Sequence, residues 1–250
     1  MIWLIFISFF ASLLSGLTGL AGGAILMAVL SFFMPITDAI AVHAAIQVFS
    51  NALRLFLFRH HVNWVIFMGY VLLTVPGVFL ATSILLEVPE EAIELLIGVL
   101  ILASLPKRPI PTTANVSSKS SQALTFSVLG FFSSFVSMIA GTVGPLIAPF
   151  FLRAGLKKES FIATKAACQM GVQLTKLVFF SVSLDFAFHQ HLSLLTALII
   201  AVSAGTFTAK SLMPHISTGS FLLAIKWLLI LLATEMILSA GWHFFTARPI

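Results

Sequence analysis

Long apolar segments separated by short polar stretches dominate the chain. They fall at about 2–34, 39–58, 64–86, 91–105, 123–152, 160–182, 192–213 and 220–247. The apolar runs are continuous and do not alternate with a period of two, which excludes a transmembrane β-barrel. Since a helix needs roughly 20 apolar residues to cross a bilayer, the pattern predicts an all-α bundle of about eight membrane segments.

The composition supports a membrane protein and excludes a soluble domain. Sixty per cent of the residues are hydrophobic and 8% are charged, whereas a soluble domain carries about 25% charged residues. The lipid bilayer is therefore the expected environment. The net charge of +5 is spread too thinly to indicate a nucleic-acid partner. The single cysteine, Cys168, excludes an intramolecular disulfide framework and a CxxC motif.

The chain divides into two similar halves. A stretch rich in Pro, Ser, Thr and Lys at 106–121 predicts a cytoplasmic linker between an N-terminal repeat, 1–105, and a C-terminal repeat, 122–250. A shift of 122 residues places Gly19 on Gly141, Gly22 on Gly144 and Gln47 on Gln169. Such duplication is common in secondary transporters, so we expect the repeats to form a single transport domain.

Two apolar segments are too long for one span and are interrupted by small residues. The interruptions are SGLTGLAGG at 15–23 in the first segment, 2–34, and SMIAGTVGP at 137–145 in the second, 123–152. Each segment is either one long kinked helix or a re-entrant hairpin that enters and leaves the membrane on the same side.

The distribution of charge favours hairpins. With hairpins, one side of the membrane receives the basic residues Arg59, Lys107, Arg108, Lys119, Arg153, Lys157, Lys158 and Lys210. The other side receives Asp38, Glu87, Glu90, Glu91 and Asp185, with only Arg248 against the positive-inside rule. This topology predicts two inverted repeats in the inner membrane, with both termini on the outer, periplasmic side.

The glycine-rich interruptions are candidates for a binding site. A helix broken in the membrane leaves free N–H groups at the start of its second half, and these groups favour an anion. The candidate residues are Gly19, Gly22, Gly23, Gly141 and Gly144. The alternative is close helix packing through small residues. Ser15, Thr18, Ser137 and Thr142 add hydroxyls, although such hydroxyls more often satisfy their own helix backbone.

A polar stripe follows each glycine break. The first consists of His43, Gln47, Asn51 and Arg54, and the second, 122 residues later, of Lys165, Gln169, Gln173 and Lys176. Their spacing places each set on one helical face. Charged side chains in a bilayer usually face a cavity or a partner, although Arg54 and Lys165 also lie close enough to predicted span ends to snorkel. The excess of cations over carboxylates indicates an anionic substrate.

Glu235 is the only carboxylate well inside a predicted span. It is a candidate for proton coupling, or for neutralising a lysine of another helix. Lys226 lies nine residues before it and cannot be assumed to pair with it. His189 and His191 are too short a pattern to indicate a metal, and we expect neither a metal nor another cofactor.

The sequence resembles the TauE/SafE family of sulfite exporters. The resemblance rests on GLTGLAGGAILMAVLSFFMP at 16–35 and AGTVGPLIAPFFLRAGLKKESFIATKAACQMGVQLTKLVFF at 140–180, with GVFLATSILL at 77–86 and SAGTFTAKSL at 203–212. It implies transport of small sulfur-containing anions such as sulfite, sulfoacetate and other organosulfonates across the inner membrane. One departure is Ala21, where the family tends to have glycine.

The residues and the resemblance together predict a secondary transporter for a small anion, working by alternating access. The glycines and the two polar stripes would bind the substrate. An enzyme is not expected, because HExxH and GxSxG motifs are absent. The alternatives are an anion channel with the same residues and a non-transporting assembly partner. The transport direction, the coupling ion and the oligomeric state stay open.

Overall fold

A computed structural model describes residues 2–20, 22–82, 95, 99, 102 and 119–246. Within them every regular element is a helix, which confirms the all-α prediction. The helices are α1 (Ile2–Thr18), α2 (Gly22–Ser31), α3 (Ile36–Phe58), α4 (Trp64–Leu72), α5 (Thr74–Thr82), α7 (Lys119–Ala140), α8 (Gly144–Arg153), α9 (Lys158–Ser183), α10 (Leu192–Leu212) and α11 (Thr218–Thr246). Short 3₁₀ turns follow at Arg59–His61, Phe188–His191 and Met213–His215.

Some predicted features lie outside the described residues. They are the predicted span 91–105 apart from positions 95, 99 and 102, the linker up to 118, and the charged residues Glu87, Glu90, Glu91, Lys107, Arg108 and Arg248. The last residues of the predicted linker, 119–121, form the polar first turn of α7, whose apolar residues begin at Ala123.

Five helices in the described part of the chain are long and apolar enough to cross a membrane. They lie at Thr37–His61, Ser120–Ala140, Phe188–His215 and Thr218–Trp242, and at Trp64–Thr82, where α4 and α5 together make one span. Helix α9 is also long, at 26 residues. Its buried lysines and amide side chains lower its hydropathy, so its place in the bundle depends on neighbouring helices that shield those groups from lipid.

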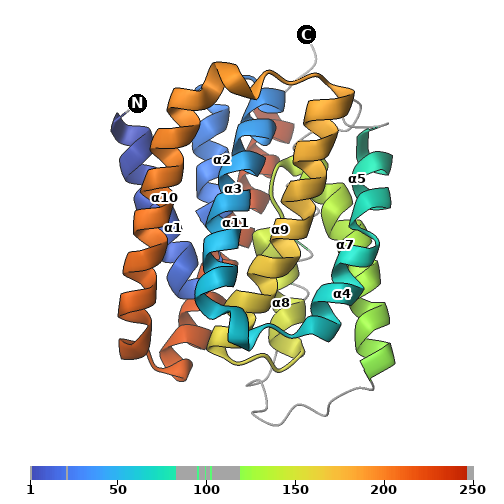
Figure 1. Ribbon diagram of the computed structural model, residues 1–250, viewed down its shortest axis with the longest axis vertical. Coiled ribbons are helices and arrows are strands. Elements are labelled where there is room, and N and C mark those ends of the chain that lie inside the picture. The colour runs from blue at the N-terminus through green and yellow to red at the C-terminus, as the bar shows by residue number, and fades with distance from the viewer. Residues whose placement is uncertain are drawn as a thin grey trace.

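Both glycine-rich segments break into two helices, as the sequence predicts. Helix α1 ends before Gly19 and α7 ends before Gly141, and both glycines have left-handed backbones, with φ of 72° and 74°. Glycine adopts this conformation without steric cost. After each break the chain turns back, so that Gly22 packs against Ala11 and Ser15 of α1. In Figure 1, α2 returns toward the end from which α1 came, and α8 toward the end from which α7 came.

The predicted span 64–86 is not one regular helix. The structure divides it into α4 and α5 at Leu73. Pro76 lies in the first turn of α5, and its ring would clash with the carbonyl of Leu72, four residues earlier, in an unbroken helix. The chain therefore bends there while continuing in the same general direction (Figure 1).

The two halves pack reciprocally around a central pair of helices. Helices α3 and α9 lie against each other in the middle of the bundle. Helix α1 of the first half packs mainly on α10 of the second, while α7 of the second half packs on α4 and α5 of the first. The first helix of each half therefore packs against helices of the other half.

Charged residues separate to the two ends of this bundle. At one end, the backbone N–H of Asn63 donates to Thr164 Oγ1 (2.9 Å), and Lys158 Nζ donates to the carbonyl oxygens of Met213 and Ile216 (2.9 and 2.8 Å). Arg59, Arg153, Lys157 and Lys210 lie at this end, whereas Asp38 and Asp185 lie at the opposite end. This is the separation expected if both glycine-rich segments are hairpins.

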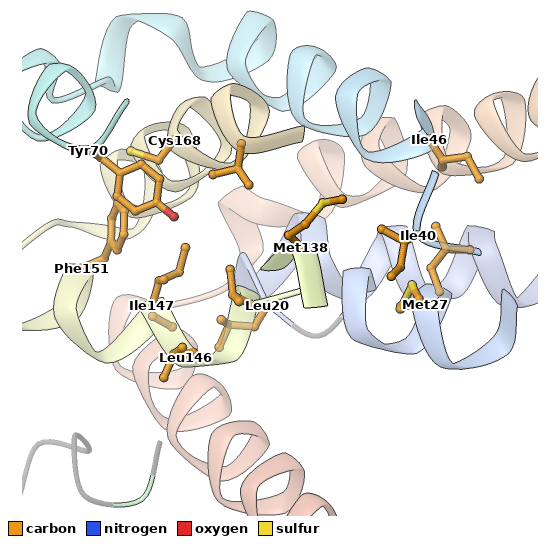
Figure 2. Close-up of a cluster of buried hydrophobic side chains, with 14 of the residues drawn as sticks. Leu20, Met27, Ile40, Ile46, Tyr70, Met138, Leu146, Ile147, Phe151 and Cys168 are labelled. Atoms are coloured by element: carbon orange, nitrogen blue, oxygen red, sulfur yellow. The ribbon is translucent and has the colours of Figure 1, made fainter. Parts of the chain in front are cut away.

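The apolar core holds the two hairpins together. Figure 2 shows Leu20 and Met27 of the first hairpin near Met138, Leu146 and Ile147 of the second, and all five are buried. A series of ring contacts joins Phe126, Phe151, Phe161 and Phe221, with centroids 5.0 to 6.3 Å apart. This packing holds α8 against α7 and α9, and α9 against α11, and thereby fixes the position of the second glycine break.

Candidate functional site

The two hairpin tips meet at a small cavity in the middle of the bundle, here called the central cavity. It is lined by Ser15, Gly19, Leu20, Gly23, Ala24, Gln47, Arg54, Thr142, Gly144, Pro145, Lys165 and Gln169. These residues come from α1, α2, α3, α8, α9 and the two glycine breaks. The cavity is therefore formed by both halves, and neither half contains it alone.

Two helix N-termini face this cavity, one from each half. Gly23 and Ala24 belong to the first turn of α2, and Gly144 and Pro145 to the first turn of α8. The first amides of a helix have no acceptor within the helix, and the helix dipole is positive at that end. Glycine permits the close approach: a Cβ on Gly23 would lie 2.7 Å from Gln47 Nε2 and 3.2 Å from Thr142 Oγ1.

Lys165 and Gln169 of α9 present hydrogen-bond donors on one side. Lys165 Nζ donates to the carbonyl of Gly19 (2.6 Å) and to Gln169 Oε1 (2.9 Å), which leaves one of its three hydrogens free. Because the Gln169 oxygen accepts from Lys165, the Gln169 NH₂ group is left as a donor, and it lies close to Gly144. The Lys165 ammonium and the Gln169 NH₂ group are thus both available to donate hydrogen bonds into the cavity.

Gln47 of α3 also lines the cavity, and His43 of the same helix contacts Gln47. His43 Nε2 lies 3.0 Å from the carbonyl oxygen of Gly23 and 3.3 Å from Gln47 Nε2. Because a carbonyl can only accept, His43 Nε2 carries the hydrogen. The Gln47 NH₂ group therefore does not donate to this ring nitrogen and keeps its hydrogens for another acceptor.

Arg54 extends from the far end of α3 to the same cavity. Its Nη1 donates to Asn51 Oδ1 (3.2 Å) and its Nη2 donates to Ser50 Oγ (2.7 Å). Arg54 is buried, and its Nε has no partner within the described residues. Asn51 therefore orients Arg54 and does not line the cavity. Snorkelling of Arg54 and Lys165 to the membrane surface is excluded, because both side chains are buried beside the cavity.

Lys176 has a different role from Lys165. Its Nζ donates to the carbonyl oxygens of Ser137 and Gly141 (2.8 and 2.9 Å), and Lys176 is fully buried. These bonds fasten α9 to the end of α7 at the second glycine break. Lys176 therefore holds the tip of the second hairpin in place, and it is not one of the residues that line the cavity.

The charge around the site is positive and unbalanced. Arg54, Lys158, Lys165 and Lys176 are buried, while no aspartate or glutamate is buried in the described part of the chain. The ion pair found there, between Lys158 and Glu159 (3.5 Å), lies at the end of the bundle, away from the cavity. Buried cations without carboxylate partners are expected where a ligand supplies the negative charge.

The structure gathers some of the predicted site residues and separates others. Those that line the cavity are Gly19, Gly23, Gln47, Arg54, Gly144, Lys165 and Gln169. His43, Asn51, Gly141 and Lys176 contact or support these residues, whereas Gly22 packs on α1. Gln173 is buried with its Oε1 unpartnered among the described residues. Glu235 lies on the exposed face of α11 and lines no described cavity.

The hydroxyl residues divide in the same way. Ser15 and Thr142 line the cavity, while Thr18 donates to the carbonyl of Leu14 in its own helix (2.7 Å). Ser8 and Ser12 are also buried, and sequence reasoning missed both. The available signal was their spacing from Ser15, since residues 8, 12 and 15 share one face of a helix.

The chain matches the model of a known protein family. The family model for sulfite exporter TauE/SafE matches residues 4–236, nearly the whole chain. No curated protein matches the chain, and no solved structure matches it. Members of the family are transporters, and the helices described above agree with a multi-pass membrane protein. The chain belongs to the sulfite exporter TauE/SafE family of membrane anion transporters.

Proposed function

We propose that the protein is a secondary transporter for a sulfur oxyanion or organosulfonate, such as sulfite or sulfoacetate, and that the central cavity is its binding site. One observation carries the proposal. Two helix N-termini, two cationic side chains and two amide NH₂ groups converge on a single buried space that has no carboxylate in its lining. Such a set of donors stabilises negative charge in a low-dielectric interior.

The arrangement of the donors favours a multi-oxygen anion over a halide. They come from α2, α3, α8 and α9, and so surround the space from several sides. A sulfite or sulfonate group carries three oxygens that point in different directions, and each of them accepts hydrogen bonds. A spherical halide makes no use of this directionality.

The size of the cavity favours alternating access over a permanently open channel. Its volume is about 10 Å³, on the order of one water molecule. Sulfite has four heavy atoms, so the hairpin tips must separate to admit it. We propose that the two halves are inverted repeats that rock against each other around the site, in the inner membrane.

Glu235 keeps its predicted place as the candidate for proton coupling. Because Glu235 is exposed on α11 and lines no described cavity, any coupling must act through movement of α11. Sulfite uptake that responds to an imposed pH gradient in the unmodified protein, and no longer responds in Glu235→Gln, supports that role.

The binding site is tested by thermal stabilisation of the purified protein. Sulfite, thiosulfate, sulfate, sulfoacetate, taurine, chloride and acetate are each added, and the unfolding temperature is measured. A ligand that binds only the folded state raises this temperature by mass action. We expect a sulfur anion to stabilise the protein, and the effect to be lost in Lys165→Ala and Gln169→Ala.

The matched control is Lys158→Ala. Lys158 is also a buried lysine of α9, but it donates to Met213 and Ile216 at the end of the bundle. This variant should unfold at a lower temperature and still respond to the anion. Absence of a shift with every anion in the unmodified protein would refute the proposed substrate class and favour the assembly-partner alternative.

A further inference from the structure

A second polar cavity adjoins the central one on the side of the first half. It is lined by Ser8, Ala11, Ser12, Gly22, Leu26, Gln47, Ser50, Arg54 and Val202, and its volume is about 10 Å³. Gln47 and Arg54 line both cavities, so these two side chains stand between them. Ser8 lies two helical turns from Ser15, which places it roughly 10 Å farther along α1.

The second cavity contains buried donors that have no partner. Ser8 Oγ and Arg54 Nε are both buried and make no hydrogen bond to the described residues. Ser50 Oγ accepts from Arg54 (2.7 Å) and retains its own hydrogen to donate. Buried polar groups are normally satisfied, and two hydroxyl donors together with the free Nε–H of a guanidinium, with no carboxylate in the lining, favour the oxygen of an anion.

The second half shows that the fold does not require such a cavity. The position 122 residues after Ser8 is Gly130, whose backbone packs directly on the backbone of Tyr70. The Tyr70 hydroxyl is bonded to Ser133 Oγ (2.5 Å). Lys176, the counterpart of Arg54, donates to the carbonyls of Ser137 and Gly141 and to Ser137 Oγ (3.4 Å), which uses all three of its hydrogens. The space that is polar and open in the first half is filled in the second.

We infer that the cavity bounded by Ser8, Ser12, Ser50 and Arg54 is a second oxyanion subsite on the transport path. This inference rests on the proposed function. Arg54 contacts the anion in either position and transfers it between the central cavity and the second subsite. Ser8 and Ser50 replace the donors that the anion leaves behind at Lys165 and Gln169. The filled second half blocks the equivalent route on its own side in this conformation.

The test compares sulfite flux with sulfite binding in purified protein. Flux is measured as uptake into proteoliposomes, and binding at the central cavity as the sulfite-induced rise in unfolding temperature. Ser8→Ala should slow uptake about fivefold, the factor for one ordinary hydrogen bond. Ser8→Val, which fills the cavity, should slow uptake by at least about tenfold. Neither variant should change the sulfite-induced shift.

The matched control is Ser134→Ala. Ser134 is the counterpart of Ser12, is fully buried on α7, and donates to the carbonyl of Phe131 in its own helix. It should leave both flux and shift unchanged. If Ser8→Val fails to fold, as judged by its unfolding without sulfite, Ser8→Ala carries the comparison.

Two outcomes overturn the inference while leaving the proposed function intact. Uptake by both Ser8 variants at the unmodified rate would place the cavity off the path. If the Ser8 variants lose both the sulfite-induced shift and sulfite uptake, the second cavity is part of the central site. A different outcome, in which the unmodified protein neither binds nor transports sulfite, overturns the proposed substrate and this subsite together.

Discussion

Three buried lysines of α9 have different roles because their hydrogen-bond partners differ. Lys158 donates to a turn at the end of the bundle, Lys176 to the carbonyls of the second glycine break, and Lys165 to Gly19 and Gln169 at the central cavity. All three have the same chemistry and similar burial. Of the three, Lys165 lines the cavity and retains a hydrogen for a ligand.

Replacement of Lys176 should affect stability more than anion binding. In Lys176→Met, the carbonyls of Ser137 and Gly141 lose their donor in a medium without water, which should lower the free energy of unfolding by about 1–3 kcal/mol. Thermal unfolding in detergent measures this loss, and the sulfite-induced shift should persist. Unchanged stability with a lost shift would return Lys176 to the binding site, where the sequence placed it.

The left-handed glycines give a second prediction at the residue scale. Gly141→Ala places a Cβ at φ of 74° and 2.6 Å from Met27 Sδ, so the free energy of unfolding should fall by about 1–2 kcal/mol. It should also weaken the sulfite-induced shift, because Thr142 and Gly144 at the cavity follow directly.

Gly155→Ala is the control for Gly141→Ala. Gly155 has φ of 71° and lies at the far end of α8, so its substitution introduces similar strain away from the cavity. It should lower stability by a similar amount and leave the anion-induced shift unchanged. Equal weakening of the shift in both variants would contradict a specific role for the hairpin tip.

At the scale of elements, small residues allow α7 to approach α4 and α5 closely. Gly69 faces the backbone of Ala123, Gly77 faces the backbone of Phe131, and Gly130 packs on the backbone of Tyr70. Ser127 adds a hydrogen bond to the carbonyl of Gly69 (2.9 Å). In a membrane, where no hydrophobic force drives helices together, such close contact supplies the attraction.

Gly130→Ala should separate these helices. Its Cβ would overlap the carbonyl oxygen of Tyr70, which is backbone and cannot rotate away, so we expect a loss of about 1–3 kcal/mol in the free energy of unfolding. Gly241→Ala in α11 has no atom within 4 Å of the added Cβ and should be neutral or stabilising by up to about 1 kcal/mol. Thermal unfolding of both variants shows whether the loss of stability comes from the contact with Tyr70 or from replacing any helical glycine. Equal destabilisation of the two variants would contradict the packing explanation.

At the scale of the whole molecule, the position of the site depends on two hairpins that approach from opposite ends of the bundle. The chain leaves the first hairpin near Phe33, which is exposed, and leaves the second near Lys157, which is also exposed. Their ends of the bundle carry Asp38 and Arg153 respectively. Two inverted repeats in a membrane would place these positions on opposite sides.

Cysteine labelling tests this topology. The natural Cys168 is buried and is replaced by alanine to give a background without thiols. An impermeant maleimide added to intact cells should modify Phe33→Cys, whereas Lys157→Cys should react only after the membrane is permeabilised. Modification of both positions from the same side would refute the inverted arrangement.

Periodicity and composition by themselves determined the helices and the membrane class of this protein. Apolar runs of sufficient length specify spans, and glycine at 19 and 141 specifies breaks, because only local sterics and transfer to lipid are involved. The sequence also predicts the polar stripes on α3 and α9, since helical spacing alone places each set on one face. The effect of Pro76 is equally local, and the break at Leu73 that it produces is a feature that apolar run length alone does not indicate.

Only the tertiary structure decided which of these polar groups share a site. It placed Lys165, Gln169, Gln47 and Arg54 around one cavity, moved Lys176 behind the hairpin tip, and left Glu235 on the surface of α11. It also showed that Ser8 and Ser12 border a second cavity, whereas their counterparts Gly130 and Ser134 are packed. These distinctions depend on contacts between different helices, from 35 positions apart for Lys176 and Gly141 to 146 for Lys165 and Gly19, and helical spacing within one segment contains no information about them.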